Sequence, residues 1–116
     1  MRRSTFDMDD FKSIIEKILE FRDKRDWKQF HNTKDLSLAL SIEAAELNEL
    51  FLWKKSNEAD IKRLREELAD IFIYAILISE KEKFDIREII LSKLELNREK
   101  YPVQEAKGSA KKYNQS

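Results

Sequence analysis

Residues 61–78 read IKRLREELADIFIYAILI, and this stretch decides the fold. In its first half, apolar residues recur three or four positions apart, which predicts an amphipathic helix. In its second half, Ile71–Ile78, the helix is apolar nearly all round and must be surrounded by other helices. The apolar run is too short to span a bilayer. Because 116 residues supply few neighbouring helices, we expect contacts between subunits to cover part of it.

Two helices are expected before this stretch. The first runs from about Met8 to Arg25, with apolar residues on one face and Asp7 as its N-cap. A polar and aromatic connector follows it. The second helix begins at Asn32 or Thr33, since both residues are good N-caps.

Local signals also mark where the third and fourth helices begin and end. The pair Ser56-Asn57 indicates a break and a cap before the third helix. Asp85, followed three residues later by Glu88, resembles a capping box that starts the fourth helix. Pro102 ends that helix, because the residue before a proline avoids the helical conformation. We therefore predict an all-α bundle of four to five helices, completed by oligomerisation.

The composition supports one helical domain, residues 1–102, and a polar, Lys-rich tail, residues 103–116, that we expect to be flexible. Gly and Pro each occur once and charged residues make up 40% of the chain, which suits long helices better than tight-turned sheets. The 23 basic and 23 acidic residues cancel, so no long-range field favours nucleic acid or an anionic membrane as a partner. The chain has no cysteine and no apolar stretch of signal-peptide length at its N-terminus, so we expect a cytoplasmic protein.

Four acidic residues do not fit the packing pattern. Glu43 and Glu46 lie three residues apart in the second helix, and Glu67 and Asp70 lie three apart in the third. This spacing places each pair on one side of its helix, next to apolar positions. Four converging carboxylates in a partly dry site would repel one another unless cations neutralised them. Ligands that offer only oxygen select a hard ion, Mg²⁺ or alternatively Mn²⁺.

Two other interpretations of these acids stay open. In a chain this charged, either pair alone would be read as ordinary solvated surface. Two pairs beside apolar stripes on consecutive helices make that the weaker interpretation. A di-iron bundle would need Glu-x-x-His pairs, and the single histidine, His31, lies in a connector.

The pattern Glu43-x-x-Glu46 followed by Glu67-x-x-Asp70 resembles the metal-binding signature of the MazG-like, all-α NTP pyrophosphohydrolases. Other segments are similar, in order and approximate spacing, to the dCTP-hydrolysing members of that family. These segments are RDWKQFH at 25–31, LFLWK at 50–54, EELADIFIY at 66–74 and SKLELNREKYP at 92–102. The resemblance covers about residues 11–102.

The resemblance implies a magnesium-dependent enzyme that cleaves a nucleoside triphosphate between its α and β phosphates. The products are a nucleoside monophosphate and pyrophosphate, and the best guess for the substrate is dCTP or a modified dCTP. In such an enzyme the ions hold the triphosphate oxygens, offset their charge and lower the pKa of a bound water. The resemblance also implies a homodimer or homotetramer in which neighbouring subunits complete the base pocket.

Individual residues match three functional groups of the family. The residues that match its metal ligands, and so carry catalysis, are Glu43, Glu46, Glu67 and Asp70. Those that match its phosphate-side residues are Lys93, Asn97, Lys100 and Tyr101. Those that match positions around the base are His31, Trp53 and Tyr74, with Trp27 and Phe30 behind them.

The sequence departs modestly from the family at positions that affect helix spacing and, through it, base preference, but no metal ligand is lost. It has Ala44, Ala45 and Ala69 where many members have glycine, and the connector at 54–65 is short. The main rival hypothesis is a helical interaction module that dimerises through its apolar third helix and catalyses nothing. Nucleic-acid binding would rest on the basic tail at 107–112 alone, and a sustained basic face is missing from the sequence.

Overall fold

The computed structural model describes residues 8–108, and within that range it contains helices and no strand. The prediction of an all-α fold is confirmed. The α-helices are α1 (Met8–Lys24), α2 (Thr33–Glu49), α3 (Ile61–Lys81), α4 (Ile86–Lys100) and α5 (Val103–Ala106), and two short 3-10 helices are η1 (Lys28–Phe30) and η2 (Ser56–Glu58). None of the described helices combines the length and the apolar character that crossing a membrane requires.

The chain folds as two compact units, Met1–Lys83 and Phe84–Ser116. The second unit contains α4 and α5, so the predicted tail begins with a short helix. The rest of that tail, from residue 109, lies outside the described residues, as does Asp7, the predicted cap of the first helix. The single domain at 1–102 and the flexibility of the tail stay predictions.

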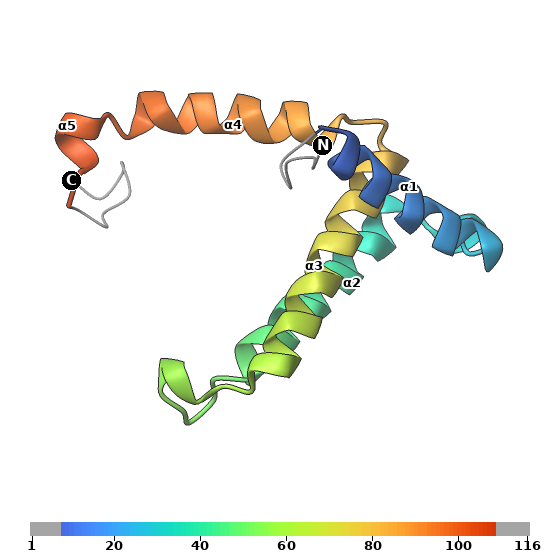
Figure 1. Cartoon of the computed structure of the whole chain (residues 1–116), viewed down its shortest axis with the longest axis horizontal. Helices are drawn as coiled ribbons and strands as arrows, with labels where there is room; N and C mark the ends of the chain where they lie inside the picture. Colours follow the sequence, from blue (N-terminus) through green and yellow to red (C-terminus); the bar gives the residue numbers. More distant parts are fainter. Residues whose placement is uncertain (1–7, 109–116) are drawn as a thin grey trace, which may run out of the picture. The chain divides into compact units, whose positions relative to one another are not determined.

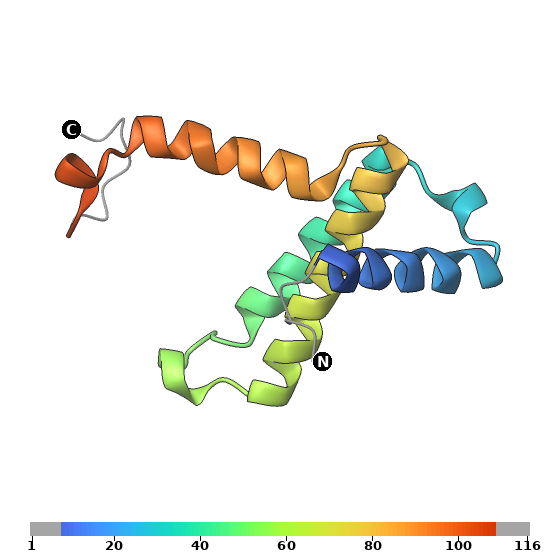
Figure 2. The same ribbon diagram turned by 45° about the horizontal axis from the view of Figure 1, so that its top comes forward.

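In the first unit, α2 and α3 run antiparallel and side by side, and α1 crosses α3 (Figures 1 and 2). The core is small and lies along the α2–α3 pair, with Leu36, Leu50, Ile76 and Leu77 each at most 7% exposed. The apolar half of α3 is less covered than its sequence demands, because Phe72 is still 61% exposed. Packing within the first unit therefore buries only part of that helix.

Side chains cap the helices at the positions where backbone N–H groups lack partners. Asn32 caps α2 by accepting a hydrogen bond from the backbone N–H of Asp35, at 2.8 Å. Asp85 caps α4 by accepting from the backbone N–H of Glu88, at 3.2 Å. Both caps were predicted, and α4 ends just before Tyr101 and Pro102, as expected.

The predicted cap of the third helix was wrong. Ser56 and Asn57 form the short helix η2 instead, and Asp60 caps α3. The Asp60 carboxylate accepts from the backbone N–H groups of Lys62 and Arg63, at 3.0 and 3.3 Å. Asp, Ser and Asn are similarly good N-caps, so the extra 3-10 turn moves the start of α3 to Asp60.

We expect Asn32→Ala to lower the free energy of unfolding by about 1 kcal/mol, the usual cost of removing an N-cap side chain. Denaturant unfolding followed by tryptophan fluorescence measures the change. The control Ser37→Ala lies at an exposed position inside the same helix and should change stability by less than about 0.5 kcal/mol. Equal stability of Asn32→Ala and the unmodified protein would contradict the assigned cap.

Candidate functional site

The antiparallel α2–α3 pair brings three of the four predicted acids together. Glu43, Glu46 and Glu67 each offer a carboxylate oxygen, and these oxygens lie within 4.8 Å of one another. All three side chains are half-buried. We call these three residues the acid cluster. Asp70, one turn after Glu67 on α3, is also half-buried and lies beside the cluster rather than in it.

The electrostatics of the acid cluster show that its negative charges are poorly compensated. The pKa of Glu43 is raised from 4.5 to about 7. The largest cause is a hydrogen bond with Glu67, which requires a shared proton; burial, the hydrogen bond and charge of Glu46, and the charge of Asp70 add to it. At pH 7 Glu43 is therefore protonated in roughly half of the molecules, whereas an ordinary glutamate would be almost fully ionised.

One oxygen of the cluster lacks any hydrogen-bond partner. Glu67 Oε2 is buried and unpaired among the described residues. A buried carboxylate oxygen without a donor costs free energy, and a bound ion is a standard partner for such an atom. The close oxygens, the retained proton and the unpaired atom all fit a site built for a hard divalent cation, Mg²⁺ or Mn²⁺. His31 is not part of the cluster, so the arrangement gives no support to a di-iron site.

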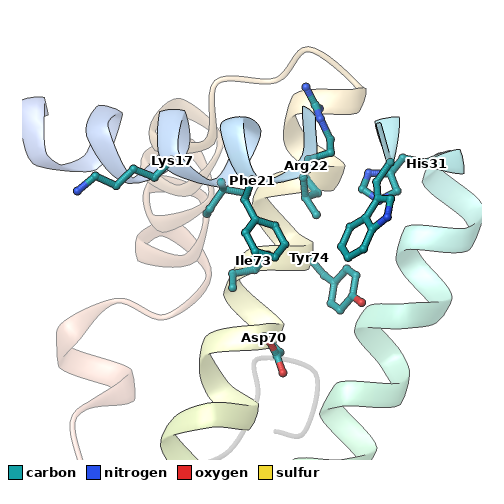
Figure 3. Close-up of a pocket in the computed structure, with 10 residues that line it drawn as sticks. Lys17, Phe21, Arg22, His31, Asp70, Ile73 and Tyr74 are labelled. Atoms are coloured by element: carbon teal, nitrogen blue, oxygen red, sulfur yellow. The ribbon is translucent and has the colours of Figure 1, made fainter. Parts of the chain in front are cut away.

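A cavity of about 420 Å³ adjoins the acids and shares Asp70 with them (Figure 3). Its wall is mostly apolar and aromatic, and it comes from α1, α3 and the connector before α2. The residues that line it are Lys17, Ile18, Phe21, Arg22, Trp27, His31, Asp70, Ile73, Tyr74 and Leu77. We call this cavity the aromatic pocket. A mostly apolar cavity of this size with a few polar groups is typical of a small-molecule site.

His31 and Tyr74, both predicted to surround a base, line the aromatic pocket together with Trp27. Burial, and secondarily the charges of Arg22 and Lys81, lower the pKa of His31. Burial, and secondarily the charges of Glu43 and Asp70, raise the pKa of Tyr74. At neutral pH the His31 imidazole is therefore neutral and the Tyr74 phenol keeps its proton. The pocket then offers a bound neutral ring one acceptor nitrogen, on His31, and hydrogen-bond donors from both side chains.

Trp53 does not join this pocket within one chain. It lies in the segment between α2 and α3, has a positive φ of 62°, and its side chain is 100% exposed. Phe30, predicted to back the base site, is 67% exposed and does not line the pocket either. The assignment of Trp53 to a base site stays a prediction.

The residues predicted to contact phosphates all belong to the second unit. Lys93, Asn97 and Lys100 lie on α4, and Tyr101 is its C-cap, with its backbone N–H donating to the Asn97 carbonyl at 2.8 Å. Asn97 and Tyr101 are half-buried, whereas both lysines are exposed. Their role at a triphosphate stays a prediction.

Sequence reasoning missed the contribution of α1 to the pocket. Phe21 and Arg22 line it, but no site residue of α1 was predicted from the sequence. A signal was present: Arg22 lies three and four residues after the apolar Leu19 and Ile18, on the same helix face. Its side chain is 12% exposed and paired with Asp23 at 2.8 Å. A charged residue on an apolar stripe was the signal that this helix face lines a cavity with a few polar groups.

Comparison with known proteins identifies the family. Residues 38–115 match the model of the MazG-like family. The chain belongs to the MazG-like family. This range includes the acid cluster, Asp70 and Tyr74, so the arrangement described above lies in the part of the chain that carries the family pattern.

Named relatives and a solved structure agree with the MazG-like assignment. dCTP pyrophosphatase 1 of Mus musculus is 40% identical over 102 residues, which cover 81% of this chain and 60% of the relative. The Homo sapiens protein of the same name is 38% identical over 104 residues, covering 83% and 61%. The chain thus spans about 60% of the length of the curated relatives it matches. A pyrophosphatase crystal structure from Archaeoglobus fulgidus aligns with a TM-score of 0.75 and 30% identity, over 88% of this chain and 98% of that one.

The acid cluster predicts an unusual pH dependence for the metal-free protein. Because the folded pKa of Glu43, about 7, exceeds its unfolded value near 4.5, the folded state binds more protons between these values. The free energy of unfolding should therefore fall as the pH rises through this window. Glu43→Gln should flatten that dependence and raise stability at neutral pH.

Urea unfolding in a chelator at several pH values from 4.5 to 8 measures both effects. The control Glu49→Gln removes an exposed acid from the same helix and should keep the dependence of the unmodified protein. If Glu43→Gln also kept it, the raised pKa would belong to another group.

Proposed function

We propose that this chain is a divalent-cation-dependent nucleoside triphosphate pyrophosphohydrolase. It cleaves between the α and β phosphates of a dNTP, with dCTP or a modified dCTP preferred, and gives a dNMP and pyrophosphate. The observation that carries this proposal is the acid cluster, whose three carboxylate oxygens lie within 4.8 Å of one another, with the aromatic pocket next to it. The relatives named dCTP pyrophosphatase 1 support the same activity.

The acids would hold the cation, since Glu43, Glu46 and Glu67 already converge and Asp70 is one turn away. When bound, Mg²⁺ supplies charge neutralisation for the phosphates and activation of the attacking water. Asp70 belongs to both the pocket wall and the acid region. A substrate would therefore lie with its phosphates at the acids and its base in the pocket.

The aromatic pocket would receive the base. Trp27 and Tyr74 offer ring faces and edges for stacking, and neutral His31 can exchange hydrogen bonds with an amino or carbonyl group. Ile18, Ile73 and Leu77 add apolar wall, which suits a pyrimidine with or without a small apolar substituent. The α4 group, Lys93, Asn97, Lys100 and Tyr101, would contribute donors to the triphosphate.

The active form would be a homo-oligomer, a dimer or a tetramer. Large apolar side chains on α2 and α3 stay exposed in the first unit, among them Leu38 at 59% and Phe72 at 61%. Trp53, fully exposed on the α2–α3 connection, is then free to take part in a base site together with another subunit.

Pyrophosphate release from a panel of dNTPs and NTPs, each with and without Mg²⁺, tests the proposed reaction. We expect Mg²⁺-dependent release that is strongest for dCTP or a 5-substituted dCTP. Asp70→Asn should lower turnover more than about 100-fold, because even changes to the outer partners of metal ligands cost 10- to 100-fold. The control Glu66→Gln, at an exposed position on α3, should stay close to the unmodified enzyme.

Other outcomes have clear meanings. A different preferred nucleotide would keep the metal site and reject the pocket assignment. Full turnover in Asp70→Asn would reject the assigned acids. No release from any nucleotide would favour the non-catalytic interaction module.

A further inference from the structure

The turn that follows α1 fixes the backbone of Trp27. The backbone N–H of Trp27 donates to the Arg22 carbonyl at 3.1 Å, and that of Asp26 donates to the Asp23 carbonyl at 3.0 Å. Asp26 has a φ of 55°. Together these features define a Schellman motif, the helix end in which a left-handed residue satisfies the last carbonyls.

Two side-chain hydrogen bonds also hold this turn. The Gln29 side-chain amide donates to the Asp26 carbonyl at 3.1 Å and to the Asp26 carboxylate at 2.8 Å. The left-handed residue is therefore tied to η1, the short helix that Trp27 precedes. These hydrogen bonds hold the backbone of the turn, but they do not by themselves fix the orientation of the Phe21 and Trp27 rings.

The two aromatic rings at this turn, Phe21 and Trp27, are only partly buried. Phe21 is 52% exposed and Trp27 is 45% exposed, although both line the cavity. They meet edge to face, with centroids 5.8 Å apart and planes at 73°. A contact between these two helix-end positions often accompanies the Schellman motif, and edge-to-face pairs of this kind are attractive.

Arg25 covers this pair. Its guanidinium lies 3.6 Å from the Phe21 ring centroid and 5.9 Å from the Trp27 ring. The same group donates from Nη1 to the Phe21 carbonyl at 3.0 Å. The hydrogen bond holds the guanidinium over the face of the Phe21 ring. Arg25 itself is not among the residues that line the pocket.

We propose that Arg25 is a positioning residue for the base pocket: its guanidinium, stacked on Phe21, holds Phe21 and Trp27 in the orientation that receives the base. The proposal rests on the function proposed above. Arg25 touches neither the substrate nor the acid cluster, so it sets the affinity for the nucleotide and leaves the bond-breaking step alone.

The proposal depends on the planar shape of Arg25 more than on its charge. A lysine keeps the charge but loses the plane and the geometry of the carbonyl contact. Arg25→Lys should therefore be as damaging as Arg25→Gln. If Arg25 instead attracted phosphates as a point charge, Arg25→Lys would behave like the unmodified enzyme.

Steady-state kinetics with dCTP and Mg²⁺ test this on the 116-residue chain. Both Arg25 variants should raise KM about five-fold, as expected if losing the planar contact on Phe21 weakens base binding by about 1 kcal/mol, and keep kcat within about two-fold. The matched control is Lys24→Gln, which removes the neighbouring positive charge, paired with Glu20 at 2.7 Å, and should leave KM unchanged. The two Arg25 variants should lower the thermal midpoint by only a few degrees, because the contact is lost within the folded chain itself, whereas Lys24→Gln should keep the midpoint of the unmodified protein.

A spectroscopic readout separates this proposal from the proposed function. The chain has two tryptophans, so 5-fluorotryptophan labelling gives two ¹⁹F resonances, assigned with Trp53→Phe. Both Arg25 variants should shift or broaden the Trp27 resonance and leave that of Trp53 in place, whereas Lys24→Gln should move neither.

The proposal is overturned by an unmoved Trp27 resonance, by a normal KM in Arg25→Lys, or by a fall in kcat at constant KM. If the unmodified chain releases no pyrophosphate, the proposed function fails, and the Trp27 resonance alone then decides whether Arg25 holds the rings.

Discussion

Repulsion among the carboxylates of Glu43, Glu46 and Glu67 is the constraint on which the rest of the structure depends. Their oxygens lie within 4.8 Å of one another on two helices, and such an arrangement is unfavourable without a compensating charge. The small core between α2 and α3 must hold the helices together against this repulsion. The retained proton at Glu43 and the unpaired Glu67 oxygen show that the repulsion is only partly relieved. A cation would relieve it further, so binding and stability are linked in this fold.

Two neighbouring regions of the first unit therefore serve different purposes. On the α2–α3 pair, the positions of the acids favour a bound cation but lower the stability of the cation-free protein. Next to them, α1 and its terminal turn supply a pocket whose polar groups, His31 and Tyr74, are neutral at physiological pH because of burial and the surrounding charges. A strongly charged site beside a neutral, aromatic one suits a ligand that has an anionic end and a flat, polar ring.

Much of this arrangement follows from local patterns. The i, i+3 spacing of the acids and the side-by-side packing of consecutive helices predicted the acid cluster, and the caps at Asn32 and Asp85 follow from short-range chemistry. The start of α3 was missed because three good capping residues compete within five positions. The pocket wall from α1 was missed because it depends on how α1 crosses α3, which is decided by tertiary packing. Trp53 is fully exposed and has a left-handed backbone conformation, which no glycine marks in the sequence.

The central claim is that the acid cluster binds a divalent cation. Mn²⁺ titration followed by electron paramagnetic resonance tests it directly, because free Mn²⁺ gives a sharp signal that is lost on binding. We predict that the unmodified chain removes the free signal, that Glu67→Gln does so far more weakly, and that Glu66→Gln, its exposed neighbour, binds normally. Equal binding by the unmodified chain and Glu67→Gln would contradict the account, since the buried oxygen without a partner would then have no part in holding the ion.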